Sequence, residues 1–323
     1  MRVFLTGANG FAGSHLVDGL VAGGHQVTGL VYGKGYEVVH PNFQAVEGNL
    51  LDLAMMKQVV ADSRPDIIYH LAGQALTAGS WVNPTQTIMV NTGGTINLLE
   101  AAVAFGRPRV VVVNSAEIYG VIRPEQLPIT ERSQPNPNHP YGVSKWAAGQ
   151  MIRLYWQRYQ LPVIEARPFN HIGPRQAPGF VVPDFASQLA AMKLGQRPAV
   201  LSVGNLSAER DFTDVRDVVR AYMALAERGQ PGETYIICSG QPIKIHYILN
   251  VLIELSGVNV EVVYDPQRMR PSELPTLYGS YRRIQRHTGW KPKIHLRQSL
   301  ADAFQDWLTK LQPDDDNLRK YHS

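Results

Sequence analysis

Three observations predict an α/β fold in which helices cover both faces of a doubly wound parallel sheet. Strand-like and helix-like segments alternate from the N-terminus to about residue 170. A glycine-rich turn joins the first strand to the first helix. The segment 109–113 is a nearly continuous apolar run, as expected of a strand that is covered on both faces. Such sheets bind their ligands at the carboxyl ends of the strands.

Composition limits the classes of function. The 323 residues suit one large domain or two closely associated ones, and 44% hydrophobic with 18% charged residues is ordinary for a globular protein. The net charge is only +4, without a basic cluster, so we expect no nucleic-acid partner. Cys238 is the single cysteine, which excludes an intrachain disulfide and suits a reducing compartment.

Targeting signals also bear on the location. No apolar run approaches the ~20 residues that span a bilayer. The N-terminus leads directly into a strand and does not have the layout of a signal peptide. We therefore expect a cytoplasmic protein that is not bound to a membrane.

The first strand, Val3–Leu5, ends in a turn whose glycines fall at every third position, at Gly7, Gly10 and Gly13. The first glycine allows the turn, the second lets the backbone approach a pyrophosphate, and the third lets the helix pack on the strand. The helix N-terminus then offers free N–H groups to phosphate. The expected cofactor contacts in this turn are Gly7, Asn9, Gly10, Phe11, Ala12 and Gly13.

The second strand, Gln26–Val31, should end beside the adenosine ribose of the cofactor. A carboxylate at this place would select NAD, but the chain continues with Tyr32 and Lys34. Lys34 suits a 2′-phosphate and so favours NADP; a solvated loop lysine is the alternative. We expect NADPH or NADH as the cofactor, with Tyr32 and Lys34 in contact with it.

The next strand ends extend the predicted cofactor site. Phe43–Val46 leads to Asn49 and Leu50, and 66–70 is followed by the small-residue turn Leu71, Ala72 and Gly73, across which a cofactor can lie. A helix is predicted over Thr85–Phe105 and carries Asn91. The strand 109–113 ends in Asn114–Gly120, which places Ser115 and Glu117 at the ligand edge.

Tyr141 and Lys145 lie four residues apart after a proline-rich loop, at the start of a proline-free run that reads as a helix. Residues at this spacing share one face of a helix. A cation near a phenol favours the phenolate, so we expect a Tyr141 pKa that is lowered toward neutrality. Such a phenol can donate a proton to an alkoxide or accept one from an alcohol.

Beyond residue 170 the regular alternation loosens. Strand Pro162–Arg167 is followed by Pro168, which we expect at the cofactor, and 234–237 is predicted to return to the main sheet. Helices are predicted over Phe180–Gly195 (containing Val181), Val218–Arg228, Ile245–Leu255 and Leu296–Leu308. The predicted domains are 1–169 plus 210–243, which binds NAD(P), and 170–209 plus 244–323, which caps the ligand cleft.

In the order in which they occur, these motifs resemble the extended short-chain dehydrogenase/reductase family, which implies a Rossmann-type fold with a smaller α/β substrate domain. The resemblance covers the whole chain and is carried by GANGFAGSH, the L-A-G-Q turn, Asn91, Ser115 and Tyr141-x-x-x-Lys145. The segments 167–176, 203–217 and 270–280 resemble the GDP-sugar branch, which contains GDP-mannose 4,6-dehydratases and GDP-4-keto-6-deoxy-D-mannose reductases. The H-I-G-P sequence within the first segment is similar to the reductases.

The resemblance implies catalytic roles. Tyr141 would donate the proton, Lys145 would hold the nicotinamide ribose and lower the phenol pKa, and Ser115 would bond the reacting oxygen. Hydride addition to a ketone leaves an alkoxide, which needs these two hydrogen bonds. Asn49 stands where the family commonly has an aspartate facing the adenine, so that contact is uncertain.

The resemblance also implies a GDP-sugar site. It would contain Glu117, Asn170, Val181, Arg210, Arg270 and Glu273. Planar arginine forks suit a diphosphate, although Arg210 has the alternative of pairing with Asp211 or Asp214. Asn170 and His171 would line the sugar, and a core or loop-capping role remains open for His171. No metal site is expected, and the family implies a homodimer.

The role of Glu117 would differ between a dehydratase and a reductase. In dehydratases of this family a glutamate here removes the sugar C5 proton, next to a residue that helps to expel the C6 hydroxyl; this chain has Ala116 there. Glu117 also has the simpler interpretation of a carboxylate that only bonds substrate or backbone. We expect reduction of GDP-4-keto-6-deoxy-D-mannose to GDP-D-rhamnose, with GDP-mannose 4,6-dehydratase as the alternative. A nucleotide-sensing protein on the same fold is a third hypothesis, which the presence of both Tyr141 and Lys145 disfavours.

Overall fold

The computed structural model describes residues 1–266 and 275–312, and its main element is a seven-stranded sheet of order β10-β6-β5-β4-β1-β2-β3. Every pair of neighbouring strands is parallel. The strands are β1 (Arg2–Thr6), β2 (Gln26–Val31), β3 (Phe43–Glu47), β4 (Ile67–His70), β5 (Arg109–Val113), β6 (Val163–Pro168) and β10 (Thr234–Ile237). The strand order reverses between β1 and β4, which confirms the Rossmann-type fold and places the ligand edge at this switch point.

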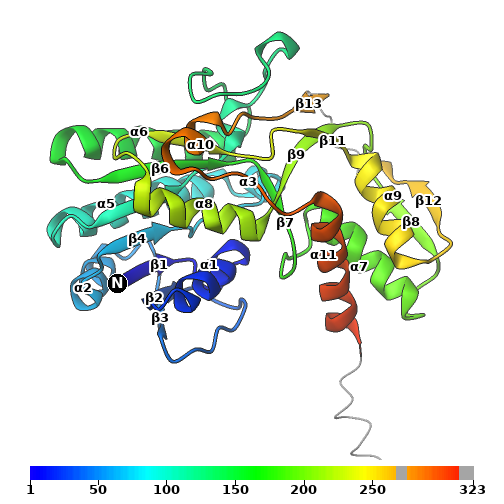
Figure 1. Cartoon of the computed structure of the whole chain (residues 1–323), viewed down its shortest axis with the longest axis horizontal. Helices are drawn as coiled ribbons and strands as arrows, with labels where there is room; N and C mark the ends of the chain where they lie inside the picture. The colour runs from blue at the N-terminus through cyan, green and yellow to red at the C-terminus, as the bar shows by residue number, and fades with distance from the viewer. Residues whose placement is uncertain (267–274, 313–323) are drawn as a thin grey trace, which may run out of the picture. The chain divides into compact units, whose positions relative to one another are not determined.

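Helices cover both faces of this sheet (Figure 1). One group comprises α1 (Phe11–Ala22), α8 (Val215–Arg228) and α10 (Arg282–Thr288); the other comprises α2 (Leu53–Ser63), α5 (Gly94–Ala104) and α6 (Pro140–Tyr159). Successive side chains of β1 point to opposite faces, so Val3 and Leu5 join the core with α1 and α8 while Phe4 joins the core with α5 and α6. The sheet is therefore buried on both sides, as the apolar strands predicted.

Residues 84–104 are helical without a break, as predicted for Thr85–Phe105, but they are not one regular α-helix. The chain forms α4 (Pro84–Ile88), a π-helical turn at Met89–Gly93 and then α5. A short helix, α3 (Thr77–Val82), precedes them. Single π turns inside helices occur frequently at functional sites, and this one carries Asn91. None of the helices in the described part of the chain is both long enough and apolar enough to cross a bilayer.

The chain divides into two compact units. The first consists of Met1–His171, Asp211–Pro242 and Thr276–Lys293, and the second of Ile172–Arg210, Ile243–Pro275 and Ile294–Ser323. The chain thus passes between units after residues 171, 210 and 242, near the predicted boundaries at 169, 209 and 243.

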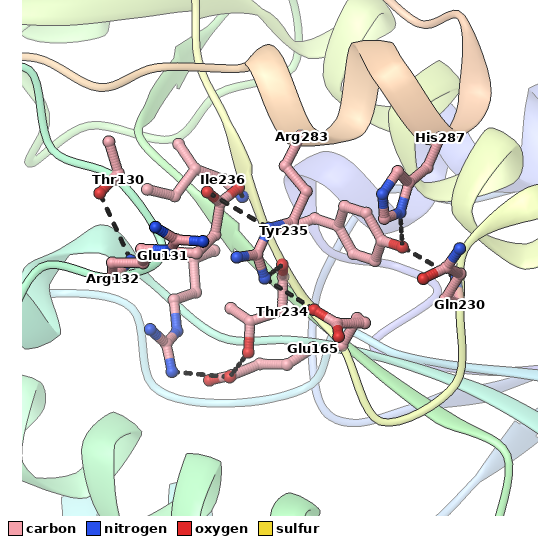
Figure 2. A network of polar contacts seen from close by, with 12 residues as sticks. Thr130, Glu131, Arg132, Glu165, Gln230, Thr234, Tyr235, Ile236, Arg283 and His287 are labelled. Carbon is pink, nitrogen blue, oxygen red and sulfur yellow. Dashed lines mark hydrogen bonds and ion pairs between the residues drawn. The ribbon is translucent and has the colours of Figure 1, made fainter.

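One part of the predicted division is wrong. Residues 276–293 were expected in the smaller domain but belong to the first unit. Trp290 lies in the core beside α8, and its indole N–H donates to the carbonyl of Asp217 at 2.9 Å. Arg283 donates to Glu233 at 2.7 Å and contacts Glu131 at 3.6 Å; Arg283 and Glu131 are labelled in Figure 2. These contacts come from side chains distant in sequence, which a reading of local alternation does not detect.

The described part of the second unit contains three helices, α7 (Val181–Lys193), α9 (Ile245–Ser256) and α11 (Leu296–Leu311), which pack on one another. β8 (Val200–Val203) pairs in parallel with β12 (Glu261–Tyr264). A further sheet, in which β9 is central, is formed by four short strands, β7 (Asn170–Ile172), β9 (Glu209–Asp214), β11 (Pro242–Lys244) and β13 (Thr276–Leu277). Of these, β13 and most of β7 and β9 belong to the first unit.

Candidate active site

The turn after β1 has the geometry of a phosphate cradle. Gly7 has a φ of 74°, and a Cβ on Gly13 would meet the carbonyl oxygen of Gly7 at 1.9 Å, so both positions require glycine. The N-cap of α1 is Gly10, which has no side chain to occupy the free N–H groups of the first turn. These backbone N–H donors, which include those of Phe11 and Ala12, fit the pyrophosphate of a dinucleotide.

The loop after β2 lies against this cradle. Asn9 donates from Nδ2 to the carbonyl of Gly33 at 3.1 Å and accepts at its own carbonyl from the N–H of Tyr36 at 2.8 Å. Tyr32 and Lys34 are exposed in this loop. The two residues are therefore held beside the glycine turn, and the exposed ammonium of Lys34 is accessible to an anion.

The strand ends next to β1 present small or backbone groups. Gly73 has room for no Cβ, which would meet Asn91 Oδ1 at 2.7 Å and lie 3.6 Å from Lys145 Nζ. Leu71 and Ala72 are partly buried before it, and Ala72 N–H donates to Thr6 Oγ1 at 3.2 Å. These residues lie where a cofactor would cross the sheet edge.

Asn49 and Leu50 lie at the end of β3 and contribute differently. The side chain of Asn49 accepts from Leu51 N–H at 3.0 Å and so stabilises its own turn. Leu50 is buried, and its carbonyl accepts from Asn97 Nδ2 at 2.8 Å. The structure thus fixes this turn through local hydrogen bonds, and a contact of Asn49 with adenine stays a prediction.

Asn91 links two walls of the site. Its Oδ1 accepts from the N–H of Gln74 at 2.8 Å, and its Nδ2 donates to Ser144 Oγ at 2.9 Å. Thr92 donates to the carbonyl of Ser144 at 2.9 Å. The π turn therefore fixes both the loop after β4 and the first turns of α6, which carry Tyr141 and Lys145.

Tyr141 and Lys145 lie on α6, as predicted, and both are buried. Lys145 Nζ donates to the carbonyl of Val113 at 3.0 Å. Burial lowers the pKa of Lys145 to about 8, although the nearby carboxylate of Glu165 raises it. The ammonium is thus held at the end of β5, within reach of a group bound at Gly73.

The predicted lowering of the Tyr141 pKa is wrong. Burial raises the pKa of the phenol to about 12; a hydrogen bond with Ser115 lowers it, and the charge of Glu117 raises it. The ammonium of Lys145 is directed to Val113, so desolvation of the phenolate decides the sign. Tyr141 is consequently protonated at neutral pH and suited to donating a proton.

Ser115 supplies a second hydrogen-bond group next to Tyr141. Its Oγ accepts from the N–H of Glu117 at 3.1 Å, which leaves the hydroxyl proton for the hydrogen bond with Tyr141 or for a ligand oxygen. Ser115 and Tyr141 are buried at 8% relative exposure each. Two hydrogen-bond groups thus converge on one place, as stabilisation of an alkoxide requires.

Glu117 has a partner that sequence reasoning missed. Its carboxylate lies 3.0 Å from His139 Nε2, and the side chain of His139 is the N-cap of α6. The ring of His139 is nearly parallel to that of Tyr141, with 6.1 Å between centroids and 7° between planes. The only local signal was a histidine directly before Pro140, at the position where a helix N-cap is expected.

A buried ion pair holds two of the turns that form the site, and sequence reasoning did not predict it. Glu165 accepts from Arg167 at 2.7 Å and from Thr234 at 2.8 Å, the second contact being drawn in Figure 2. Arg167 in turn donates to Tyr119 Oη at 2.9 Å. Asn114 joins Glu165 to α6, because its Nδ2 also donates to the carbonyl of Lys145 at 3.0 Å. The pair thus holds both the turn that carries Glu117 and the turn that carries Lys145.

Pro168, Asn170 and His171 follow β6. Pro168 is buried at the strand end. Asn170 donates to the carbonyl of Asp211 at 3.3 Å. His171 stacks on Phe11 of the glycine turn at 5.6 Å and 12°, with its Nδ1 lying 3.2 Å from the carbonyl of Phe169. The structure thus gives His171 a packing role in the cradle, and its contact with a sugar stays a prediction.

The remaining predicted residues lie elsewhere. Val181 opens α7 and Arg210 is in β9, both in the second unit, where Arg210 donates to the carbonyl of Glu209 at 2.8 Å. Arg270 and Glu273 lie outside the described residues. Within 1–266 and 275–312, no cluster of three or more histidine, cysteine or carboxylate side chains is suited to a metal ion.

The second unit has a polar hollow of its own. It measures about 180 Å³ and is lined by Asp184, Ser187, Gln188, Arg197 and Ser202. Gln188 is buried, and its Oε1 has no hydrogen-bond partner within the described chain. A buried acceptor without a partner is costly to the fold.

Comparison with known proteins points to one family. The model of the GDP-mannose 4,6 dehydratase family matches residues 4–303. The chain is 37% identical to GDP-6-deoxy-D-mannose reductase of Pseudomonas aeruginosa, covering 96% of this chain and 98% of that protein. It is 26% identical to GDP-mannose 4,6-dehydratase of Yersinia enterocolitica, covering 93% of this chain and 92% of the relative.

Solved structures give the same picture. RMD from Pseudomonas aeruginosa, complexed with NADPH, matches with a TM-score of 0.85 at 34% identity, covering 96% of this chain and 100% of that one. UDP-glucose 4-epimerase of Thermotoga maritima with UDP-glucose matches with a TM-score of 0.88 at 28% identity, covering 97% and 100%. The similarity therefore extends over both compact units.

Proposed function

Because the chain belongs to the GDP-mannose 4,6-dehydratase family, we propose that it is a nucleotide-sugar reductase of that family. It reduces the C4 ketone of GDP-4-keto-6-deoxy-D-mannose with NADPH and forms GDP-D-rhamnose. The observation that carries this proposal is the pair of hydrogen-bond groups, Tyr141 and Ser115, beside the buried Lys145. The similarity to the Pseudomonas aeruginosa reductase supports it.

The residues act on a single oxygen. When bound at the glycine cradle, NADPH supplies a hydride to the sugar C4 carbon. Tyr141, which is protonated at neutral pH, donates its proton to the oxygen that gains negative charge, and Ser115 holds the same oxygen by a second hydrogen bond. We assign to Lys145 the nicotinamide ribose, since its ammonium lies near Gly73 at the strand end.

NADPH is favoured over NADH by two observations. The loop after β2 presents the exposed ammonium of Lys34 and contains no carboxylate before Glu37. The similar RMD structure is a complex with NADPH. A ribose 2′-phosphate would gain from the cation, whereas a free 2′-hydroxyl would lack the carboxylate that usually binds it.

The GDP part of the substrate belongs, in our proposal, to the second unit. Arg210 and Val181 lie there, and so does the polar hollow with the unpaired Gln188 Oε1. Guanine carries N–H donors on one edge, which suit the carboxylate of Asp184 in the lining of the hollow. Arg270 and Glu273, which lie outside the described residues, remain in this proposal as contacts of the GDP-sugar.

We propose a homodimer that forms through α6 and the helices beside it. Val143 and Trp146 on α6 are 39% and 41% exposed, and Trp81 and Ile88 on α3 and α4 are 65% and 41% exposed. Exposed apolar side chains on neighbouring helices are characteristic of association surfaces.

The single cysteine, Cys238, is buried and forms no disulfide, which suits a reducing cytoplasm, where we place the reaction.

The dehydratase alternative uses Glu117 as a base toward the sugar C5 proton. Here the carboxylate is engaged by His139, and the neighbouring Ala116 has no acid or hydroxyl to assist departure of the C6 hydroxyl. A reductase needs neither step. These observations favour reduction.

A stoichiometric assay tests the proposal. Purified protein is incubated with GDP-4-keto-6-deoxy-D-mannose and NADPH, and cofactor oxidation is followed by absorbance while the sugar is identified by NMR. We expect one NADPH oxidised per sugar. GDP-mannose with catalytic NADP⁺ should yield little 4-keto product, and Glu117→Gln should retain substantial reductase activity. Faster formation of the 4-keto sugar than its reduction, with loss on Glu117→Gln, would establish the lyase instead.

A further inference from the structure

His70 is a buried histidine at the end of β4 that takes no part in the proposed reaction steps. It is 2% exposed and lies beside Thr6 of β1 in the parallel register. The two residues are therefore neighbours at the point where the strand order reverses, next to the turn that the cofactor would cross. Both ring nitrogens have partners, since Nδ1 lies 2.7 Å from Thr6 Oγ1 and Nε2 lies 3.1 Å from Thr95 Oγ1.

The partners of the two threonines fix the positions of the protons. Thr95 Oγ1 lies 2.6 Å from the carbonyl oxygen of Asn91, a distance that places the threonine proton between the two oxygens. Thr95 Oγ1 can then only accept from Nε2, which must carry the ring proton. Thr6 Oγ1 accepts from the N–H of Ala72 at 3.2 Å and donates its own proton to Nδ1. A second ring proton would bury a positive charge between two hydroxyl groups, which is costly.

The four hydrogen bonds thus run in one direction, from the N–H of Ala72 through Thr6, His70 and Thr95 to the carbonyl oxygen of Asn91. In such a chain each hydrogen bond polarises and strengthens the next one. Desolvation and the nearby charge of Lys145 lower the pKa of His70 to about 3, which agrees with a neutral ring at neutral pH.

Both ends of this chain lie at the predicted cofactor site. At one end, Ala72 packs on the glycine turn so closely that a Cβ on Gly7 would meet Ala72 N at 2.9 Å. At the other end, the π turn carries Asn91, whose Oδ1 would lie 2.7 Å from a Cβ on Gly73. The imidazole therefore joins the turn that packs on the glycine cradle to the π turn that holds the first turns of α6.

We propose that His70 is a positioning residue, which as a neutral imidazole with its proton on Nε2 fixes the turn 71–73 against the π turn at Asn91, so that NADPH binds in place for hydride transfer. The proposal rests on the proposed reductase function and adds to it a residue that acts through Thr6 and Thr95. A contribution to folding alone would change the stability of the protein and leave its affinity for NADPH unchanged. Binding and stability measurements therefore separate the two roles.

Valine substitutions remove a threonine hydroxyl with little change of shape. Thr95→Val removes the acceptor of Nε2 together with the donor to Asn91, and Thr6→Val removes the donor to Nδ1. Thr288→Val is the matched control, because Thr288 is also buried in a helix, donates to the carbonyl four residues earlier at 2.7 Å and accepts one N–H at 3.2 Å. Thr288 lies in α10, on the opposite face of the sheet from Thr95 of α5.

Binding of NADPH to the full-length variants is measured by fluorescence titration, and their stability by thermal unfolding. We expect Thr95→Val and Thr6→Val each to raise the Kd of NADPH about three- to tenfold, the effect of losing one hydrogen bond. Thr288→Val should unfold at a lower temperature than wild type and keep the wild-type Kd. A wild-type Kd in either Thr95→Val or Thr6→Val, or an equal rise in Thr288→Val, would overturn the proposal.

A second measurement uses the wild-type protein and does not depend on the folding of a variant. In ¹⁵N-histidine-labelled protein, the ring nitrogens of His70, assigned with His70→Gln, should report an unprotonated Nδ1 and a protonated Nε2 at pH 7. A proton on Nδ1 would contradict the proposal. Neither measurement requires a sugar, so a protein that binds NADPH but does not reduce the 4-keto sugar refutes the proposed function and leaves this test of His70 intact.

Discussion

Replacement of Lys145 by methionine should stabilise the fold at neutral pH while it removes activity. Lys145 is 8% exposed, and its ammonium donates to Val113 O at 3.0 Å. Burial, partly offset by Glu165, lowers its pKa to about 8. Methionine has a similar length and carries no charge, so Lys145→Met removes the cost of desolvation with little change of volume.

The magnitude follows from the pKa. A fall from 10.5 to about 8 corresponds to about 3 kcal/mol of destabilisation at pH 7, at 1.36 kcal/mol per pH unit. The variant also loses the hydrogen bond to Val113, which costs it about 1–2 kcal/mol and offsets part of this gain in stability. We expect Lys145→Met to be more stable than wild type by about 1–2 kcal/mol at pH 7.

The stability difference between wild type and Lys145→Met depends on pH. Between the two pKa values the unfolded chain binds the proton and the folded protein does not, so wild-type stability rises with pH in that window. Relative to the variant, wild type should gain about 2 kcal/mol between about pH 7.5 and about pH 9.5. Urea unfolding without nucleotide at both pH values measures this, with Lys291→Met, an exposed lysine, as the control. A Lys145→Met protein that is less stable at pH 7, or a difference that does not vary with pH, would refute the reasoning.

Three further predictions concern the site. Tyr141→Phe should lower turnover by about 10²–10⁴-fold with NADPH affinity retained; near-normal turnover measured by NADPH oxidation would exclude Tyr141 as the acid. Gly13→Ala should weaken NADPH binding at least about tenfold by fluorescence titration, since its Cβ would meet Gly7 O at 1.9 Å, and wild-type affinity would show that the cradle is not the binding site. Lys34→Ala should raise the Kd of NADPH and leave that of NADH unchanged; equal effects on both would place the 2′-phosphate elsewhere.

Sequence patterns predicted the parallel sheet well because its strands signal themselves locally. The glycine spacing at Gly7, Gly10 and Gly13 and the apolar segment 109–113 each reflect a constraint within a few residues. The strands at both ends of the sheet, β3 and β10, were also predicted from their own residues. The π turn at Asn91 was not, because its cause is the set of contacts to Gln74 and Ser144 rather than the helix sequence.

The limits of the site prediction are electrostatic and tertiary. The four-residue spacing placed Tyr141 and Lys145 on one helix but said nothing about desolvation, which reversed the expected pKa change. Glu117 was recognised through resemblance, whereas His139 had no motif and became visible only with the 3.0 Å contact. Glu165 and Arg167, two residues apart on a strand, would both point to one side of the sheet, but their burial depends on α6.

The most direct test of the proposed reaction follows the hydrogen itself. NADPH deuterated at C4 of the nicotinamide is supplied with GDP-4-keto-6-deoxy-D-mannose, and the sugar product is examined by NMR and mass spectrometry. A reductase transfers the label once, so we expect deuterium at C4 of a 6-deoxy sugar and one oxidised cofactor per product. A dehydratase returns its hydride to C6 and consumes no added cofactor. Recovery of the 4-keto sugar and the deuterated NADPH unchanged, together with formation of 4-keto sugar in a parallel mixture of GDP-mannose and NADP⁺, would contradict the proposed function.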